Sequence, residues 1–359
     1  MTRIYLDHAA TTPLRPEARE AMLRGFEIWA NPSSPHADGR AARAALEDAR
    51  ARVKAALNWD GEVIFTSGAS EAAALALNRA RGGARLVSAV EHDAMLRAAP
   101  DATVIPVTSD GAVDLDVLRR ELAVSDKPIV GIQTINSETG NLQDFCEIAD
   151  IVDEAGGLSV IDASQGAGKF RFRYPASMVI VSAHKFGGPI GIGALLLSDY
   201  ALLEPVGGHE RGYRRGTENL PGALGMAAAL EAGGEPYLSW DCHAVMEQFA
   251  TEVRAIGGTW FADRLDAPTG YIHAVAMPGV SAKAQLMRFD LRGISISQGS
   301  ACSSGSLHSS HVLQAMQVPE EEAQRAIRIS FGWSTTREEV ERFVEAWLAM
   351  ARQDAERSA

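Results

Sequence analysis

The chain has 359 residues, of which 46% are hydrophobic and 22% are charged, and its formal net charge is −12. A chain of this length and apolar content can bury a large core and is expected to form two subdomains. The negative charge argues against nucleic acid or an anionic membrane surface as the principal partner. Neither a membrane-spanning apolar run nor a signal peptide at residues 1–7 is expected, because the required apolar segments are missing from the sequence.

In the first two thirds of the chain, short apolar segments alternate with segments of helical period. Strands are predicted at 62–66, 85–90, 103–107, 128–132, 158–162, 178–182 and 191–197, with helices at 70–79, 114–122 and 144–155 between them. This alternation predicts an α/β fold with a mostly parallel sheet between helices. After about residue 234 the pattern changes to a long helix at 240–256, sparse strands and a final amphipathic helix from 337, which predicts a smaller α+β domain.

Lys185 lies at the end of the apolar run 178–181 and just before a turn that contains Gly187 and Gly188. Lysine is rare in this chain, which contains five lysines and 29 arginines. A lysine at the mouth of a buried strand is partly desolvated, which lowers its pKa and makes its amine reactive. Such an amine can form a Schiff base, most commonly with pyridoxal phosphate. A surface lysine that ends a strand is the alternative, but the neighbouring His184 and the glycines favour a cofactor site.

Small and polar residues also follow other predicted strands. The segment 66–71 leads into a helix whose backbone N–H groups could hold a phosphate, although Ser70 could simply cap that helix. Asp162 could pair with a pyridinium nitrogen and Gln165 could bind a phenolic oxygen, although Asp162 could also be only a loop cap. His92 could stack on a flat ring, although a lone histidine is more often structural. Because the carboxyl ends of parallel strands meet at one edge of a sheet, these groups are expected to share one site with the lysine.

Taken together, these segments resemble the cysteine desulfurases of the NifS/IscS type, which are class V, fold-type I enzymes that use pyridoxal phosphate. The resemblance covers nearly the whole chain and depends on motifs at 5–12, 31–36, 66–71, 91–92, 162–165, 182–188, 207–219, 300–305 and 328–332. It implies a seven-stranded, mostly parallel sheet in a large domain of residues 13–235. The smaller α+β domain would combine residues 1–12 with 236–359 and would carry a catalytic cysteine loop.

The resemblance also assigns roles to individual residues. Lys185 would carry pyridoxal phosphate, Asp162 would pair with its pyridine nitrogen and Gln165 would contact its ring oxygen. His92 would stack on the ring and assist proton transfer. The phosphate would be held by Ala69, Ser70, Ser182, His184 and Thr217, with the threonine supplied by the neighbouring subunit of an obligate homodimer. The substrate would be bound by Arg328, which would hold its carboxylate, and by Ser137 and Asn31.

The three cysteines are Cys146, Cys242 and Cys302, and their wide spacing is typical of a reducing cytoplasm without disulfides or a zinc site. Cys146 lies beside Phe145 on a predicted helix and is expected to be a buried structural residue. Cys302 lies in the small, polar segment 298–308, whose composition is typical of a mobile loop. We therefore expect Cys302 to be the exposed nucleophile, with an ordinary loop thiol as the alternative.

By resemblance, Cys302 attacks the sulfur of L-cysteine, becomes a persulfide and leaves L-alanine as the product. The sulfur would then pass to an acceptor or scaffold protein for iron–sulfur cluster assembly or tRNA thiolation. No resident metal is expected, although Cys302 could meet an iron–sulfur cluster on a partner. The alternatives are another class V aminotransferase, a selenocysteine lyase, or a noncatalytic scaffold of the same fold.

Ser137 departs from the pattern of the family, whose members usually carry two asparagines before Glu-x-Gly. Here the segment 135–140 reads Ile-Asn-Ser-Glu-Thr-Gly, so Ser137 takes the position of the second asparagine, which would contact both the cofactor and the substrate. A serine hydroxyl is shorter than an asparagine amide and is expected to lose one of these contacts. The departure predicts an enzyme that is slow with free cysteine or that depends on an activating partner.

Overall fold

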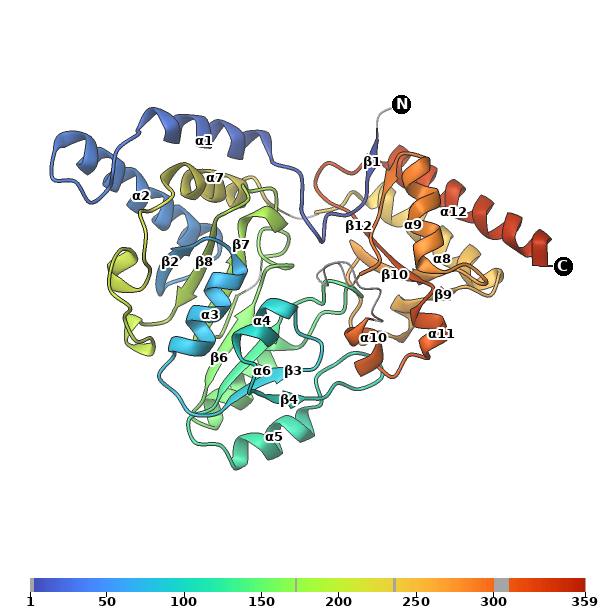
Figure 1. Cartoon of the computed structure of the whole chain (residues 1–359), viewed down its shortest axis with the longest axis horizontal. Helices are drawn as coiled ribbons and strands as arrows, with labels where there is room; N and C mark the ends of the chain where they lie inside the picture. The colour runs from blue at the N-terminus through green and yellow to red at the C-terminus, as the bar shows by residue number, and fades with distance from the viewer. Residues whose placement is uncertain (1–2, 172, 235–236, 300–309, 359) are drawn as a thin grey trace.

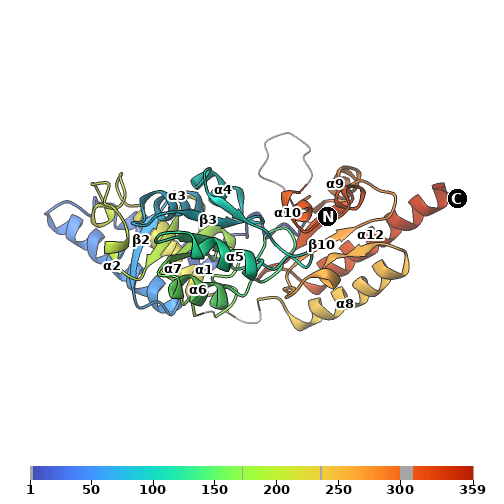
Figure 2. The ribbon, with the colours of Figure 1, turned by 90° about the horizontal axis from the view of Figure 1, so that it is seen from below.

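The computed structural model describes residues 3–171, 173–234, 237–299 and 310–358. The chain forms two regions that lie next to each other along the long axis of the molecule (Figures 1 and 2). The first region is built around a seven-stranded sheet and the second around a three-stranded sheet. Within the described ranges, no helix combines the length and apolar character needed to cross a membrane.

The seven-stranded sheet has the order β2-β8-β7-β6-β5-β3-β4. The strands β3 to β7 pair in parallel, whereas β8 pairs antiparallel with both β7 and β2. The mostly parallel α/β sheet predicted from the alternating pattern is therefore confirmed, and only the predicted strand at 191–197 runs in the opposite direction. The strand bounds are β2 (Glu62–Thr66), β3 (Arg85–Ser88), β4 (Thr103–Ile105), β5 (Ile129–Gln133), β6 (Leu158–Asp162), β7 (Met178–Ser182) and β8 (Gly193–Leu197).

Helices cover both faces of this sheet because alternate residues of each strand point to opposite sides. On one face, Ile64 and Ile180 pack against α3 (Ala69–Arg79) and α4 (Asp93–Ala98). On the other face, Val63 and Val181 belong to a core with the remaining helices of this region. These helices are α1 (Pro16–Glu27), α2 (Ala37–Ala56), α5 (Leu115–Ala123), α6 (Phe145–Glu154) and α7 (Leu220–Glu231). Residues 220–230 of α7 are all buried, because α7 lies between the sheet and the outer helices α1 and α2.

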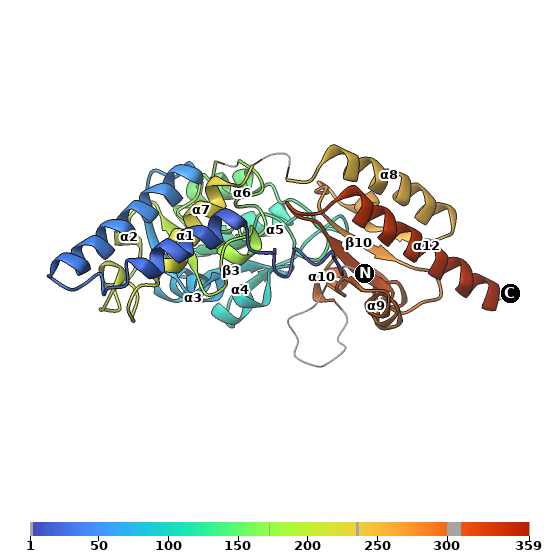
Figure 3. The ribbon, with the colours of Figure 1, turned by 90° about the horizontal axis from the view of Figure 1, so that it is seen from above.

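The second region has a three-stranded antiparallel sheet in the order β12-β10-β9. The helices α8 and α12 lie side by side on one face of this sheet (Figure 3), and their aromatic core includes Phe249, Phe343 and Trp347. The N-terminal strand β1 pairs in parallel with β11, so the first residues pack with the C-terminal part of the chain. The bounds are β1 (Ile4–Tyr5), α8 (Trp240–Ala255), β9 (Thr259–Trp260), β10 (Ile272–Ala276), α9 (Ala282–Leu291), β11 (Ile294–Ser295), α10 (His311–Ala315), α11 (Glu320–Ala323), β12 (Ala326–Ser330) and α12 (Arg337–Ser358). The domain boundaries at 12/13 and 235/236 stay predictions.

The structure corrects the expectation for the structural cysteine. Cys146 is exposed, although its neighbour Phe145 is buried. Adjacent residues on an α-helix point about 100° apart, so a residue next to a core position can face solvent. Cys242 on α8 is instead the buried thiol among the described cysteines, and Ser239 Oγ donates a hydrogen bond to its Sγ over 3.2 Å.

Candidate active site

A cavity of about 820 Å³ opens at the carboxyl ends of the parallel strands, where the first region meets β12 and α10. This volume is within the range of small-molecule and cofactor sites. Most residues expected at the site line this one cavity: Ala69, Ser70, His92, Ser137, Asp162, Gln165, Ser182, His184, Lys185 and Arg328. They follow β2, β3, β5, β6 and β7 or lie on β12, so the convergence expected from the strand ends is present.

Lys185 ends a single helical turn, Ala183–Lys185, directly after β7. Its Nζ donates hydrogen bonds to the carbonyl oxygens of Ala9 over 2.7 Å and Ala10 over 3.0 Å. The two carbonyls belong to the N-terminal segment, and they hold the Lys185 amine at the cavity. The turn after Lys185 requires glycine, because Gly187 has φ +92° and a Cβ there would lie 2.6 Å from Arg15 Cγ.

Asp162 and Gln165 lie at and just after the end of β6, and both are buried. Asp162 Oδ1 accepts a hydrogen bond from the backbone N–H of Ser164 over 2.9 Å, so the side chain also closes the turn that follows the strand. Gln165 Nε2 donates to the carbonyl oxygen of Ala9 over 2.8 Å. Asp162 therefore caps the loop, as the alternative interpretation of the sequence predicted, and it also lines the cavity.

The expected phosphate cradle is the segment between β2 and α3. Gly68 precedes the helix with φ +153°, and a Cβ there would find only Ser182 Oγ, at 3.9 Å. Ala69 and Ser70 are the first residues of α3, an eleven-residue helix whose free N–H groups favour an anion. Ser182 lies at the end of β7 and is buried at the same place. This arrangement can accept a phosphate group.

His184 is uncharged at neutral pH, unlike a cationic phosphate ligand. Burial lowers its pKa to about 4, and the positive charges of Lys185 and Lys169 and the imidazole of His92 contribute further. Its Nδ1 shares a hydrogen bond of 3.0 Å with Thr11 Oγ1. A neutral imidazole can offer a hydrogen bond to a phosphate but no ionic attraction.

His92 is the N-cap residue of α4, and its Nδ1 accepts a hydrogen bond from the backbone N–H of Ala94 over 3.1 Å. In a neutral ring this contact places the proton on Nε2. The same contact also fixes the ring orientation at the edge of the cavity.

Glu91, next to His92, is a buried site residue to which the sequence assigned no role of its own. Its Oε1 accepts hydrogen bonds from Ser88 Oγ over 2.6 Å and from the backbone N–H of Gln133 over 3.0 Å. Among the described residues, Oε2 has no partner. Burial, and to a lesser degree the nearby charge of Asp162, raise the pKa of Glu91 to about 8. Glu91 is therefore protonated at neutral pH.

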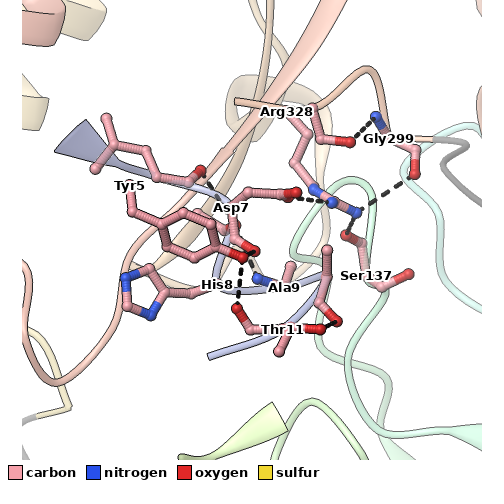
Figure 4. A network of polar contacts seen from close by, with 12 residues as sticks. Tyr5, Asp7, His8, Ala9, Thr11, Ser137, Gly299 and Arg328 are labelled. Atoms are coloured by element: carbon pink, nitrogen blue, oxygen red, sulfur yellow. Dashed lines mark hydrogen bonds and ion pairs between the residues drawn. The ribbon is translucent and has the colours of Figure 1, made fainter. Parts of the chain in front are cut away.

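Arg328 on β12 joins three segments at the cavity, as Figure 4 shows. It is only 3% exposed. Its Nη2 lies 2.6 Å from Asp7 Oδ1, and its Nη1 donates to the carbonyl oxygens of Ser137 over 2.9 Å and Gly299 over 3.3 Å. Within the described part of the chain, the buried Nε has no acceptor. Because a buried donor without a partner is costly, this N–H is available for a ligand carboxylate. Asp7 was missed by the sequence reasoning, although it lies inside the N-terminal motif.

The two consecutive polar residues after β5 both line the cavity, but they have different hydrogen-bonding roles. Asn136 closes the turn, because its Oδ1 accepts hydrogen bonds from the backbone N–H groups of Glu138 and Thr139, both over 2.9 Å. Ser137 lines the cavity. Glu138 Oε2 accepts a hydrogen bond from Ser310 Oγ over 2.5 Å. The turn 136–138 is thus closed by the Asn136 side chain, and all three of its residues line the cavity.

Two predicted site residues that the structure describes, Asn31 and Thr217, do not line the cavity. Asn31 is exposed between α1 and α2, where its Oδ1 accepts a hydrogen bond from the backbone N–H of Ser33. Thr217 is exposed on the loop before α7. Neither lines the cavity. Cys302 lies in the segment 300–309, outside the described residues, but the cavity is lined by Gly299 before this segment and by His311 after it.

The family model for Aminotransferase class-V matches residues 4–343. The chain belongs to the class V aminotransferase family. A cysteine desulfurase from Cereibacter sphaeroides is 37% identical to this chain, and the match covers 96% of this chain and 95% of the relative. The solved NifS-like protein from Rickettsia africae is 31% identical with a TM-score of 0.86, over 97% of this chain and 99% of that chain. The structure of SspA in complex with cysteine is 28% identical with a TM-score of 0.77, over 93% and 100% of the two chains.

These findings confirm the resemblance to the cysteine desulfurases and the fold type that the sequence motifs predicted. Enzymes of this family depend on pyridoxal phosphate. Within the described residues, no group of three or more His, Cys, Asp or Glu side chains could hold a metal ion.

Proposed function

We propose that this protein, a member of the class V aminotransferase family, is a cysteine desulfurase. It would convert L-cysteine to L-alanine and pass the sulfur through Cys302 to an acceptor. One observation carries the proposal: Lys185, Asp162, His92 and Arg328 all line the same cavity, although they come from four different segments of the chain. The cysteine desulfurase relative and the cysteine complex of a similar structure support the choice of substrate.

The residues of the cavity fit pyridoxal phosphate. The N-terminus of α3, with Ser182 and the neutral His184, would hold the phosphate. Asp162 would pair with the pyridine nitrogen, and Gln165 and Ser137 would lie near the ring oxygen. When bound through Lys185, the cofactor would supply an electron sink for negative charge at the substrate Cα. Because Glu91 beside Asp162 is protonated, it does not compete for that positive nitrogen.

Within this site, each side chain has a defined task. Arg328 would hold the substrate carboxylate with Nε, which has no acceptor among the described residues, and with Nη2, which Asp7 already orients. Lys185 Nζ would take the proton from the substrate Cα after leaving the Ala9 and Ala10 carbonyls. The Cys302 thiolate would then attack the substrate sulfur, so that the sulfur–sulfur bond forms as the bond from sulfur to Cβ breaks. Protonation of the remaining fragment gives alanine, and the sulfur stays on Cys302 as a persulfide.

A homodimer is part of the proposal, and the outer surface of α1 supports it. Leu23, Phe26 and Trp29 on and just after α1 are exposed, with Trp29 at 75%, and the Phe26 and Trp29 rings stack 6.0 Å apart. The helix covers α7 on the outside of the first region (Figure 1). An apolar surface of this kind fits a second copy of the chain. In that dimer the exposed Thr217 would reach the phosphate of the partner's cofactor, and the exposed Asn31 would act near the substrate.

The acceptor of the sulfur is proposed to be a scaffold or carrier protein for iron–sulfur cluster assembly or tRNA thiolation. The negative net charge supports a protein acceptor over direct contact with nucleic acid. The widely spaced cysteines support a reducing cytoplasm as the place of action.

The test is incubation of the purified protein with L-cysteine, pyridoxal phosphate and a thiol reductant, followed by measurement of alanine and sulfide. Equal amounts of the two products are expected, with Lys185→Ala as the inactive control. Absence of both alanine and sulfide, with no persulfide on the protein, would support another class V transaminase. Turnover of selenocysteine but not cysteine would identify a selenocysteine lyase, and protein that stays colourless with pyridoxal phosphate would identify a noncatalytic scaffold.

A further inference from the structure

Lys169 is a buried amine that the proposed reaction does not use. It follows β6 in the same turn as Gln165, and it is only 1% exposed. Burying an ammonium group is costly unless other groups stabilise it. A lysine held at such a position therefore needs a reason beyond packing.

The Lys169 amine is surrounded by one hydrogen-bond acceptor and two aromatic rings. Its Nζ donates a hydrogen bond to Gln165 Oε1 over 2.9 Å. It also lies 4.9 Å from the ring centroid of Tyr271 and 5.4 Å from that of Tyr237. Aromatic faces at these distances stabilise an ammonium group. Burial, and then the charges of Lys185 and Arg328, lower the pKa of Lys169.

The side-chain amide of Gln165 has its two ends fixed by two different partners. Its Nε2 donates to the carbonyl oxygen of Ala9, which can only accept, and its Oε1 faces the Lys169 amine. A rotation of the amide by 180° would place oxygen against oxygen at Ala9 and lose both contacts. The Ala9 carbonyl also accepts the hydrogen bond from Lys185 Nζ, so Gln165 Nε2 and the Lys185 amine share one acceptor, and all three residues line the cavity.

Tyr271 also fixes this turn. Its hydroxyl donates a hydrogen bond to the backbone carbonyl of Gln165 over 2.5 Å, and its ring packs edge to face against Tyr237 at 5.4 Å. The backbone of Gln165 is therefore held independently of Lys169. What Lys169 adds is the direction of the side-chain amide.

We propose that Lys169 is a positioning residue, which holds Gln165 Oε1 so that Nε2 is presented to the ring oxygen of pyridoxal phosphate. The proposal rests on the proposed function, because it takes the cavity to be the cofactor site. A donor that is oriented before the cofactor arrives costs less conformational entropy on binding than one that must first rotate.

The test uses Lys169→Met in the full-length protein, because methionine keeps the length and the packing between the two tyrosine rings but cannot donate. The exposed Lys283→Met on α9 is the matched control. The measured quantities are the dissociation constant of pyridoxal phosphate from titration of the cofactor-free protein, the absorption maximum of the bound cofactor, and Tm. Lys169→Met is expected to bind pyridoxal phosphate roughly five- to tenfold more weakly, to show a shifted absorption maximum, and to have an equal or higher Tm.

A double-mutant cycle with Gln165→Leu separates positioning from a structural role. If Lys169 acts through Gln165, adding Lys169→Met to Gln165→Leu should change the dissociation constant by less than about twofold. An unchanged dissociation constant and absorption maximum in Lys169→Met would overturn the proposal. Equal weakening in both backgrounds, or a variant that does not fold, would also overturn it by assigning Lys169 to the core. Failure of the cofactor site itself would look different, because wild-type protein would then bind no pyridoxal phosphate. A different activity that depends on pyridoxal phosphate would leave these binding results unchanged and would be seen only in the alanine and sulfide assay.

Discussion

Replacing Glu91 with glutamine tests the electrostatics of the candidate site with almost no change of shape. In the folded protein Glu91 Oε1 accepts two hydrogen bonds, and a glutamine Oε1 can accept the same two from Ser88 and Gln133. The pKa of Glu91 is raised from 4.5 to about 8 by burial. In the unfolded chain the same carboxyl ionises at its ordinary pKa. The folded state therefore binds one more proton than the unfolded state between these two values.

The sign and size of the effect follow from that difference. For a carboxyl with a raised pKa, the stabilisation is complete below about pH 4.5 and is lost as the pH rises towards 8. Each pH unit in this window changes the free energy of unfolding by up to about 1.4 kcal/mol. From pH 5 to pH 8, wild type should therefore lose about 2 to 4 kcal/mol relative to Glu91→Gln. At pH 5 the two proteins should agree within about 1 kcal/mol, because both carry a neutral side chain.

The assay is urea unfolding of cofactor-free wild type and Glu91→Gln at pH 5, 6, 7 and 8 and constant ionic strength. Glu345→Gln on the exposed face of α12 is the matched control and should show no such trend. Catalytic activity at pH 7 should also remain within a few-fold of wild type, because Glu91 is already neutral there. A stability difference that does not change with pH, or that favours wild type as the pH rises, would show that Glu91 is ionised in the folded protein and would refute the reasoning.

Three further predictions address the chemistry. Borohydride reduction of the loaded protein should fix pyridoxal phosphate on Lys185, and peptide mapping that finds the label on another lysine would contradict the assignment; Lys185→Ala should lose turnover. Cys302→Ser should still change the cofactor spectrum when cysteine is added but should form no persulfide, because a serine hydroxyl is a far weaker nucleophile at neutral pH. Full sulfide release by this variant would make Cys302 a bystander. Ser137→Asn should raise kcat/KM for L-cysteine several-fold, because the longer amide can restore a hydrogen bond to a charged group; an unchanged or slower variant at saturating cofactor would mean that Ser137 is no handicap.

The sequence by itself determined the fold class and most of the candidate site. Strand and helix periods are local properties, and the parallel sheet follows from their alternation. Because parallel strands end at the same edge, His92, Asp162 and Lys185 could be assigned to one site before their distances were known. The bounds of β6 and β7 agree with the prediction, since apolar runs with clear polar ends leave little choice of boundary.

Only the tertiary structure decided which distant parts of the chain contact each other. It also decided which ionisable side chains are buried, and burial shifts their pKa values. Arg328 and Asp7 are 321 residues apart, and Lys185 meets the carbonyl of Ala9 across 176 residues. No local pattern encodes such pairs, because they form only when the N-terminal segment and β12 pack over the sheet. The protonated state of Glu91 and the enclosure of Lys169 depend in the same way on how much water the surrounding side chains exclude. Residue type was visible in the sequence, but the dielectric around each residue was set by the fold.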